Sequence, residues 1–138
     1  MPARDLFHDS VRESLEKDGW EITNDPYYVE IGDTSFHVDL GAEKLIAAKK
    51  GMEKIAVEIK GFFGPSLTSE FHTALGQFLN YSLAIQHKEP ERKLYLAIPE
   101  NVYVEFFQST FVKMAISHYG ISLVVFNPDS NEIVKWEK

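Results

Sequence analysis

The sequence predicts an α/β domain built on a central mixed β-sheet with helices on both faces. Short apolar runs such as Leu94–Ile98 and Ile121–Phe126 are typical of buried strands. Longer segments between the runs repeat apolar residues at helical spacing. Strands and helices alternate along the chain, which is the order expected of a sheet layered with helices.

The first predicted helix covers residues 4–18. Leu6, Phe7, Val11 and Leu15 recur there at helical spacing, and Gly19 is a typical residue to end the helix. A cluster of turn residues follows at 23–26.

Period-2 alternation and apolar runs predict the strands. The predicted strands are residues 27–31, 35–40, 45–48, 55–59, 94–98, 121–126 and 132–136. Residues 49–52 between the third and fourth strands predict a hairpin.

Two further helices are predicted. One starts at a cap provided by Ser66 or Ser69 and runs to about His87, and the other covers residues 100–118. Their expected inward residues are Phe71, Leu75, Phe78, Leu79 and Leu83 in the first, and Tyr103, Phe107, Phe111 and Met114 in the second.

Length and composition indicate one globular domain over residues 1–138. The absence of cysteine excludes disulfides, thiolate metal sites and a cysteine nucleophile. The first ten residues lack an apolar segment, and no apolar run approaches the roughly 20 residues that span a bilayer. We therefore expect a cytoplasmic protein that is not inserted in a membrane.

The net charge of −7 is unfavourable for binding nucleic acid, because phosphate contacts require lysine and arginine. The charge is uneven, however. Between residues 44 and 60, five lysines (44, 49, 50, 54 and 60) face only Glu53 and Glu58. This stretch is either a solvated hairpin tip or a local basic surface.

The residues that indicate chemistry are Asp39, Glu58 and Lys60. Val38 and Leu40 are expected in the core, which leaves the Asp39 carboxylate on the other face of its strand. Glu58 and Lys60 are two residues apart, so they share a strand face. Two carboxylates from adjacent strands, with the backbone carbonyl of Ile59, form an oxygen-rich site suited to Mg²⁺ or Mn²⁺. An ammonium beside that metal could position water and offset charge on a phosphate.

The alternative is a surface ion pair between Glu58 and Lys60, worth about 0–1 kcal/mol.

The pattern Asp39 … Glu58-Ile59-Lys60 after an N-terminal helix resembles the PD-(D/E)XK nuclease superfamily. The resemblance implies a restriction-endonuclease-like fold and a metal-dependent endonuclease site. Val38 stands where the motif name has proline. Gln77 and Tyr81 also resemble the QxxxY signature that some members carry on the helix after the catalytic strand, and Gln77 would then reach the site.

Over nearly its full length, the chain resembles the XisH family, the fdxN element excision controlling factors of cyanobacteria. The residues that carry this resemblance are Phe7-His8, 17–23, Asp25-Pro26, 39–43, 57–62 and Gly76-Gln77. The family is associated with programmed excision of a DNA element, alongside a site-specific recombinase and a small companion, XisI. The resemblance therefore implies DNA, an XisI-like companion and, indirectly, a recombinase as partners. Homodimerisation is compatible with the fold.

His8 falls where some branches of the superfamily place a first-helix carboxylate facing the metal. It is either a proton acceptor near the metal or a half-buried structural histidine. Gln77 either orients water or phosphate or is a satisfied helix amide. Glu43 is interpreted as a strand-edge charge rather than a ligand.

Two functions remain open from the sequence. In the first, Asp39 and Glu58 bind one divalent metal, Lys60 assists phosphodiester hydrolysis, and Gln77 positions water or phosphate. In the second, the same fold is a catalytically weak or inactive regulatory module that binds DNA or a partner protein and controls a recombinase. The acidic composition favours the second function, or a partner that supplies basic surface.

Overall fold

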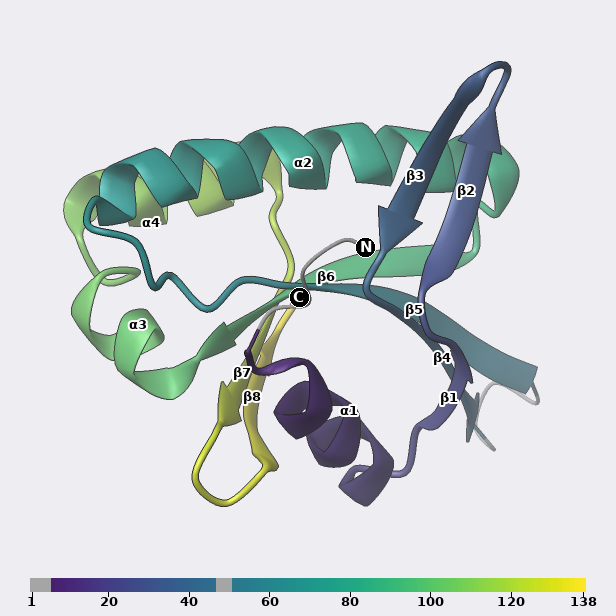
Figure 1. Ribbon diagram of the computed structural model, residues 1–138, viewed down its shortest axis with the longest axis horizontal. Helices are drawn as coiled ribbons and strands as arrows, with labels where there is room; N and C mark the ends of the chain where they lie inside the picture. Colours follow the sequence, from purple (N-terminus) through teal and green to yellow (C-terminus); the bar gives the residue numbers. More distant parts are fainter. Residues whose placement is uncertain (1–5, 47–50) are drawn as a thin grey trace.

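The order of strands in the main sheet organises the molecule. The computed structural model describes residues 6–46 and 51–138, and in these ranges six strands pair in the order β1-β4-β5-β6-β7-β8 (Figure 1). They are β1 (Glu21–Asn24), β4 (Leu40–Ile46), β5 (Gly51–Ile59), β6 (Arg92–Pro99), β7 (Leu123–Asn127) and β8 (Glu132–Glu137). The β5–β6 and β6–β7 pairs are parallel and the other pairs are antiparallel. The predicted mixed sheet is confirmed.

A separate two-stranded hairpin stands beside the main sheet. It consists of β2 (Tyr27–Ile31) and β3 (Thr34–Val38), which pair antiparallel. Gly32 at its tip has a φ of 60°, a conformation that costs glycine little. The hairpin lies against the C-terminal half of helix α2 (Leu67–Lys88), as Figure 1 shows.

The predicted strand 35–40 is divided at Asp39, where the chain bends from β3 into β4. Val38 and Leu40 are both fully buried, as predicted. However, Val38 packs in the core beneath α2 and Leu40 in the core on the other face of the main sheet. The prediction of one continuous strand was therefore wrong, because the chain changes sheets at this residue.

The predicted β4–β5 hairpin is confirmed, and its strands are longer than the apolar runs. Pairing extends from Leu40 opposite Val57 to Ile46 opposite Gly51. The predicted turn at Lys49 and Lys50 lies outside the described residues. Strand β1 was not predicted, because its four residues are mostly exposed and therefore lack an alternating pattern.

Four helices cover the main sheet in the described part of the chain. They are α1 (His8–Lys17), α2, α3 (Glu100–Glu105) and α4 (Thr110–Tyr119). The predicted helix 100–118 is thus interrupted at residues 106–109, where Ser109 adopts an extended conformation. The Ser66 hydroxyl accepts a hydrogen bond from the Ser69 backbone N–H, so Ser66 caps α2 as proposed. None of the described helices combines the length and apolarity needed to cross a bilayer.

The inward faces of α2 and α4 differ from the prediction. Leu83 is 70% exposed and Phe111 is 63% exposed, and Leu79 and Met114 also face solvent. Helix α2 instead buries Phe71, Ala74, Phe78, Ala84 and Ile85, and α4 buries Val112 and Ala115. Alanines allow these helices to approach the sheet closely, so large side chains beside them are left outside. Leu6, expected inside the first helix, precedes α1 and is exposed.

The main sheet separates two apolar cores, and α1 and α2 lie on its opposite sides (Figure 1). Along β5, Ile55, Val57 and Ile59 belong to the core under α1, whereas Ala56 belongs to the core under α2. Because side chains alternate along a strand, Glu58 is directed to the α2 side. This alternation places the candidate chemistry beneath α2.

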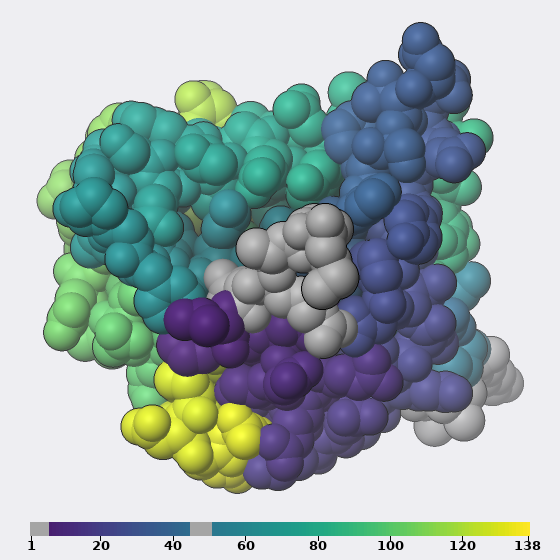
Figure 2. Space-filling model, in the orientation of Figure 1, coloured from purple at the N-terminus to yellow at the C-terminus, as the bar shows by residue number. Residues whose placement is uncertain are grey.

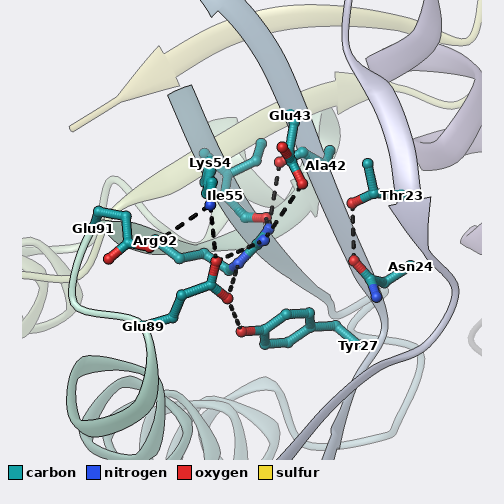
Figure 3. Close-up of polar contacts among 10 residues, drawn as sticks. All are labelled: Thr23, Asn24, Tyr27, Ala42, Glu43, Lys54, Ile55, Glu89, Glu91 and Arg92. Atoms are coloured by element: carbon teal, nitrogen blue, oxygen red, sulfur yellow. Dashed lines mark hydrogen bonds and ion pairs between the residues drawn. The ribbon is translucent and has the colours of Figure 1, made fainter. Parts of the chain in front are cut away.

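Arg92, only 5% exposed, connects β6 to several other elements (Figure 3). Its Nε and Nη2 atoms lie 2.9 and 3.1 Å from the two carboxylate oxygens of Glu89. Nη1 donates to the carbonyl of Ile55 at 2.8 Å, and the guanidinium lies over the Tyr27 ring. Hydrogen bonds from Arg92 hold the pKa of Glu89 at about 2. Removing one partner of such a buried ion pair is strongly destabilising, because it leaves the other charge buried without compensation.

Arg92→Met should therefore lower the free energy of unfolding by about 3–5 kcal/mol, because it removes the buried cation that binds both carboxylate oxygens of Glu89 and leaves that carboxylate with the more distant Lys54. Urea denaturation followed by circular dichroism measures this loss. Lys17→Met is the matched control. Lys17 forms an exposed pair with Glu13, so the control should change stability by less than about 1 kcal/mol. Equal losses in the two variants would contradict a special role for Arg92.

Candidate active site

Two carboxylates meet where β4 begins and β5 ends. The Ile59 backbone N–H donates to Asp39 Oδ2 at 2.8 Å, and the Asp39 N–H donates to Glu58 Oε1 at 3.3 Å. The bend at Asp39 makes this reciprocal contact possible, because it turns the residue toward the neighbouring strand. The two residues lie together as the sequence predicted, although Asp39 stands at the bend between β3 and β4 rather than within a strand.

Glu58 carries a strong electrostatic perturbation. Its side chain is buried, at 8% exposure. Burial first, and then the negative charge of Asp39, raises the pKa of Glu58 to about 8. Two like charges this close repel, so the site favours a proton or a cation between them.

Lys60 lies just beyond β5 and supplies part of the opposing charge. Its backbone N–H donates to the carbonyl of Ala97 at 3.0 Å, which continues the pairing with β6. Burial raises the pKa of Glu58, and the positive charge of Lys60 lowers it. Lys60 is half-buried, and its charge acts on Glu58, so the structure brings the Glu-x-Lys pair together.

Helix α2 contributes Tyr81 and Gln77. Burial is the main cause that raises the pKa of the Tyr81 hydroxyl, and the negative charges of Glu58 and Asp39 add to it. Tyr81 is therefore within electrostatic range of both carboxylates. Gln77 lies one turn earlier on the same helix face. Its Oε1 atom is buried and has no hydrogen-bond partner among the described residues. The role of Gln77 toward water or phosphate stays a prediction.

His8 occupies a different network at the start of α1. Its Nε2 lies 2.8 Å from Asp25 Oδ1, and Arg12 binds the other oxygen of Asp25 at 2.6 Å. These contacts join α1 to the residues just before β2. The contacts with Asp25 fit a structural role for His8. A catalytic role for His8 stays a prediction.

The basic stretch 44–60 offers less free charge than its composition suggests. Lys44 donates to the Asp18 carbonyl at 2.8 Å, and Lys54 pairs with Glu89 and Glu91. Lys49 and Lys50 lie outside the described residues. Glu43, interpreted as a strand-edge charge, forms an ion pair with Arg92. Lys44 and Lys54, the two described lysines of this stretch outside the site, thus have structural partners.

The sequence predicts that Gly61 and Gly64-Pro65 end the strand, but it did not predict the conformation of the loop after Lys60. Phe62 has a φ of 58°, a left-handed conformation that costs a bulky residue on the order of 1–3 kcal/mol. Its ring is buried against Phe107, whereas the next ring, Phe63, is 56% exposed. The sequence feature that could have indicated an unusual loop here is the pair of phenylalanines between Gly61 and Gly64, directly after the Glu-x-Lys pair.

The chemistry of the site suits a small hard cation. Asp39 and Glu58 supply anionic oxygens, and their repulsion would be relieved by a divalent charge. Across residues 6–46 and 51–138, no group of three or more His, Asp or Glu side chains is arranged to hold a metal. A cation here would therefore take two carboxylates and complete its shell with backbone carbonyl, such as that of Ile59, and solvent. That mixed shell is typical of Mg²⁺.

These features define a mixed α/β domain with a buried, lysine-flanked carboxylate pair at the end of a central strand. The XisH protein family model matches residues 1–134, so the chain belongs to the XisH family. No curated protein matches it.

Two solved structures are similar to the chain over its length. One is an XisH family protein from Nostoc punctiforme, with 43% identity, a TM-score of 0.89, and coverage of 97% of this chain and 100% of that chain. The other is an fdxN element excision controlling factor protein from Anabaena variabilis, with 42% identity, a TM-score of 0.89, and coverage of 98% of this chain and 100% of that chain.

The raised pKa of Glu58 predicts how stability depends on pH in metal-free protein. The unfolded chain releases this proton near the ordinary value of 4.5, whereas the folded protein holds it until about pH 8. The contribution of Glu58 to stability is therefore complete below pH 4.5 and is lost as pH rises to about 8. Urea titrations in EDTA from pH 5 to pH 8.5 measure this slope relative to Glu58→Gln, which should lack the contribution. Identical slopes in both proteins would contradict the burial of Glu58.

Proposed function

We propose that this XisH-family chain takes part in programmed excision of a DNA element, and that Asp39, Glu58 and Lys60 form a metal-dependent endonuclease site of the PD-(D/E)XK type. A restriction-endonuclease-like fold is part of this proposal. The observation that carries it is the convergence of two carboxylates and a lysine at the meeting point of β4 and β5. The role in excision is supported by the similar Anabaena variabilis protein, whose description is an fdxN element excision controlling factor.

Each residue has a defined task in this proposal. Asp39 and Glu58, with the Ile59 carbonyl, hold one Mg²⁺ or Mn²⁺, which when bound lowers the pKa of water and neutralises phosphate charge. Lys60 places a positive charge where the phosphate becomes more negative during attack. Hydrolysis then joins the water oxygen to phosphorus, and the P–O bond to one sugar breaks as that oxygen gains a proton.

The α2 residues support the same chemistry. Gln77 has a buried oxygen without a partner, which can accept a hydrogen bond from water. Tyr81 lies close enough to both carboxylates for their charges to raise its pKa. Its hydroxyl can donate to a carboxylate and fix its orientation. Both roles concern positioning rather than bond breaking.

A second function is a regulatory module that binds DNA or a partner but cleaves weakly or not at all. The specific observation in its favour is charge. The chain carries −7, and Lys44 and Lys54 already have partners within the protein. Strong binding to DNA phosphates would then need basic surface from an XisI-like companion, or the chain would act on a site-specific recombinase through protein contacts.

Lys60→Ala should abolish DNA cleavage while keeping metal binding, and Asp39→Ala should abolish both. Removal of one charge-stabilising group commonly costs about 10²–10³ in rate. The assay uses single-stranded, duplex and branched DNA with Mg²⁺ or Mn²⁺, with and without an XisI-like companion. Calorimetry with Mn²⁺ measures metal binding separately.

Lys113→Ala is the matched control, because Lys113 is exposed on α4 and should leave cleavage unchanged. Equal cleavage by wild type, Lys60→Ala and Asp39→Ala would disprove the site. Metal binding without cleavage under every condition would favour the regulatory module.

A further inference from the structure

A pocket of about 680 Å³ lies where β6 and β7 begin and β8 ends. Helices α3 and α4 supply its other walls, and Figure 2 shows α3 (green) at one end of the molecule and the β2–β3 hairpin (blue) at the other. None of the described residues that line the pocket belongs to the candidate active site. Small-molecule sites commonly have volumes of about 300–1,000 Å³, so this pocket is large enough for an organic ligand.

Three lysines line this pocket, and they come from different elements. Lys93 is the second residue of β6, Lys113 belongs to α4, and Lys138 follows β8. In the part of the chain that the structure describes, none of the three has a carboxylate within ion-pair distance, whereas Lys54 and Lys135 are paired. Cations without carboxylate partners are thus gathered at one pocket of a chain whose net charge is −7. A cleft lined by one sign of charge attracts ligands of the opposite sign.

The negative groups at the pocket do not cancel these lysines. Among the described lining residues, Glu137 is the one with a carboxylate side chain. It already accepts a hydrogen bond from the Tyr103 hydroxyl at 2.5 Å and pairs with Lys135 at 3.4 Å. Helix α4 also ends here, and a helix C-terminus carries about half a negative charge. The Ile116 carbonyl at that end accepts hydrogen bonds from two N–H groups of the following turn. The pocket therefore keeps a positive balance.

Ser122 adds a neutral hydrogen-bond donor to the wall of the pocket. It is only 5% exposed, and its backbone carbonyl accepts a hydrogen bond from the Leu96 N–H at 2.9 Å. Its hydroxyl makes no hydrogen bond to any residue that the structure describes. Gly120 leads the chain to this position, because its φ of 65° ends α4 in a conformation that few other residues adopt easily. A buried hydroxyl without a partner is unfavourable, so an acceptor bound in the pocket would satisfy it.

A small ligand with more than one phosphate fits this set of groups. A phosphate monoester carries a charge of about −1.5 to −2 at pH 7 and several acceptor oxygens, whereas a carboxylate carries a single charge. Lysines bind phosphates as point charges, and a serine hydroxyl can donate to a phosphate oxygen. Duplex DNA needs basic surface that follows its backbone, so three lysines around a concave pocket suit a small molecule better.

We propose that this pocket binds a small molecule that carries a diphosphate group, with Lys93, Lys113 and Lys138 around the phosphates and Ser122 donating to one phosphate oxygen. A diphosphate fills only part of about 680 Å³, so the remainder holds an organic portion, as in a nucleoside diphosphate. The pocket shares no residue with the carboxylate pair. Substitutions in the pocket therefore leave the proposed cleavage unchanged, and the two proposals can fail independently.

Isothermal titration calorimetry with pyrophosphate and with ADP tests the pocket, in EDTA so that no metal joins a phosphate to Asp39 or Glu58. Wild type should bind both, and ADP at least as tightly as pyrophosphate. Lys93→Met keeps an apolar stem but loses the charge, and should bind pyrophosphate about tenfold more weakly. Ser122→Ala should bind it about fivefold more weakly. The matched control is Lys88→Met, because Lys88 is also exposed but does not line the pocket, and it should bind as wild type does.

Nuclear magnetic resonance locates the bound pyrophosphate. The backbone amides of Gly120 and Ser122 should shift on titration, whereas that of Lys60 should not. Shifts at Lys60 without shifts at Gly120 and Ser122, no binding of pyrophosphate by wild type, or full affinity in Lys93→Met would each overturn the site. An equal loss of affinity in Lys88→Met would also overturn it. Binding of ADP more than tenfold weaker than that of pyrophosphate would overturn the assignment to an organic diphosphate. The nuclease function is judged separately by the Lys60→Ala cleavage assay.

Discussion

Arg92 joins the β2–β3 hairpin and the end of α2 to the strands that carry the carboxylate pair. Its guanidinium binds Glu89 after α2, the Ile55 carbonyl on β5 and the ring of Tyr27 on β2. These contacts tie the end of α2 and the start of the hairpin to the central strands. Since Asp39 ends that hairpin and Glu58 lies three residues beyond Ile55, the Arg92 contacts set the frame in which the two carboxylates meet.

The carboxylate pair itself is electrostatically unfavourable, and the fold tolerates it. Glu58 sits among apolar residues with Asp39 as a hydrogen-bonded neighbour, and its raised pKa records that cost. A purely structural pair would be replaced by apolar residues with little loss. The retained repulsion, the nearby Lys60 and the unpartnered oxygen of Gln77 are more consistent with a site that receives a cation and a phosphate.

In the proposed function, Lys60 and the two carboxylates contact the phosphate. Membership of the XisH family agrees with a DNA-related role, while the acidic surface agrees with assistance from a partner.

The sequence alone determined the mixed α/β class, the two-residue spacing of Glu58 and Lys60, and a serine cap at position 66 or 69. Each depends on local chemistry: alternation along a strand, apolar runs, or a hydroxyl at a helix start. Only the tertiary structure decided that the chain bends at Asp39, that Leu83 and Phe111 face solvent, and that Phe63 is held outward. These features depend on contacts between distant segments, such as Asp39 with Ile59 and Phe63 with Phe7, and on small alanines that let helices approach the sheet. Local patterns do not contain that information, because a side chain's direction is set by what packs against it.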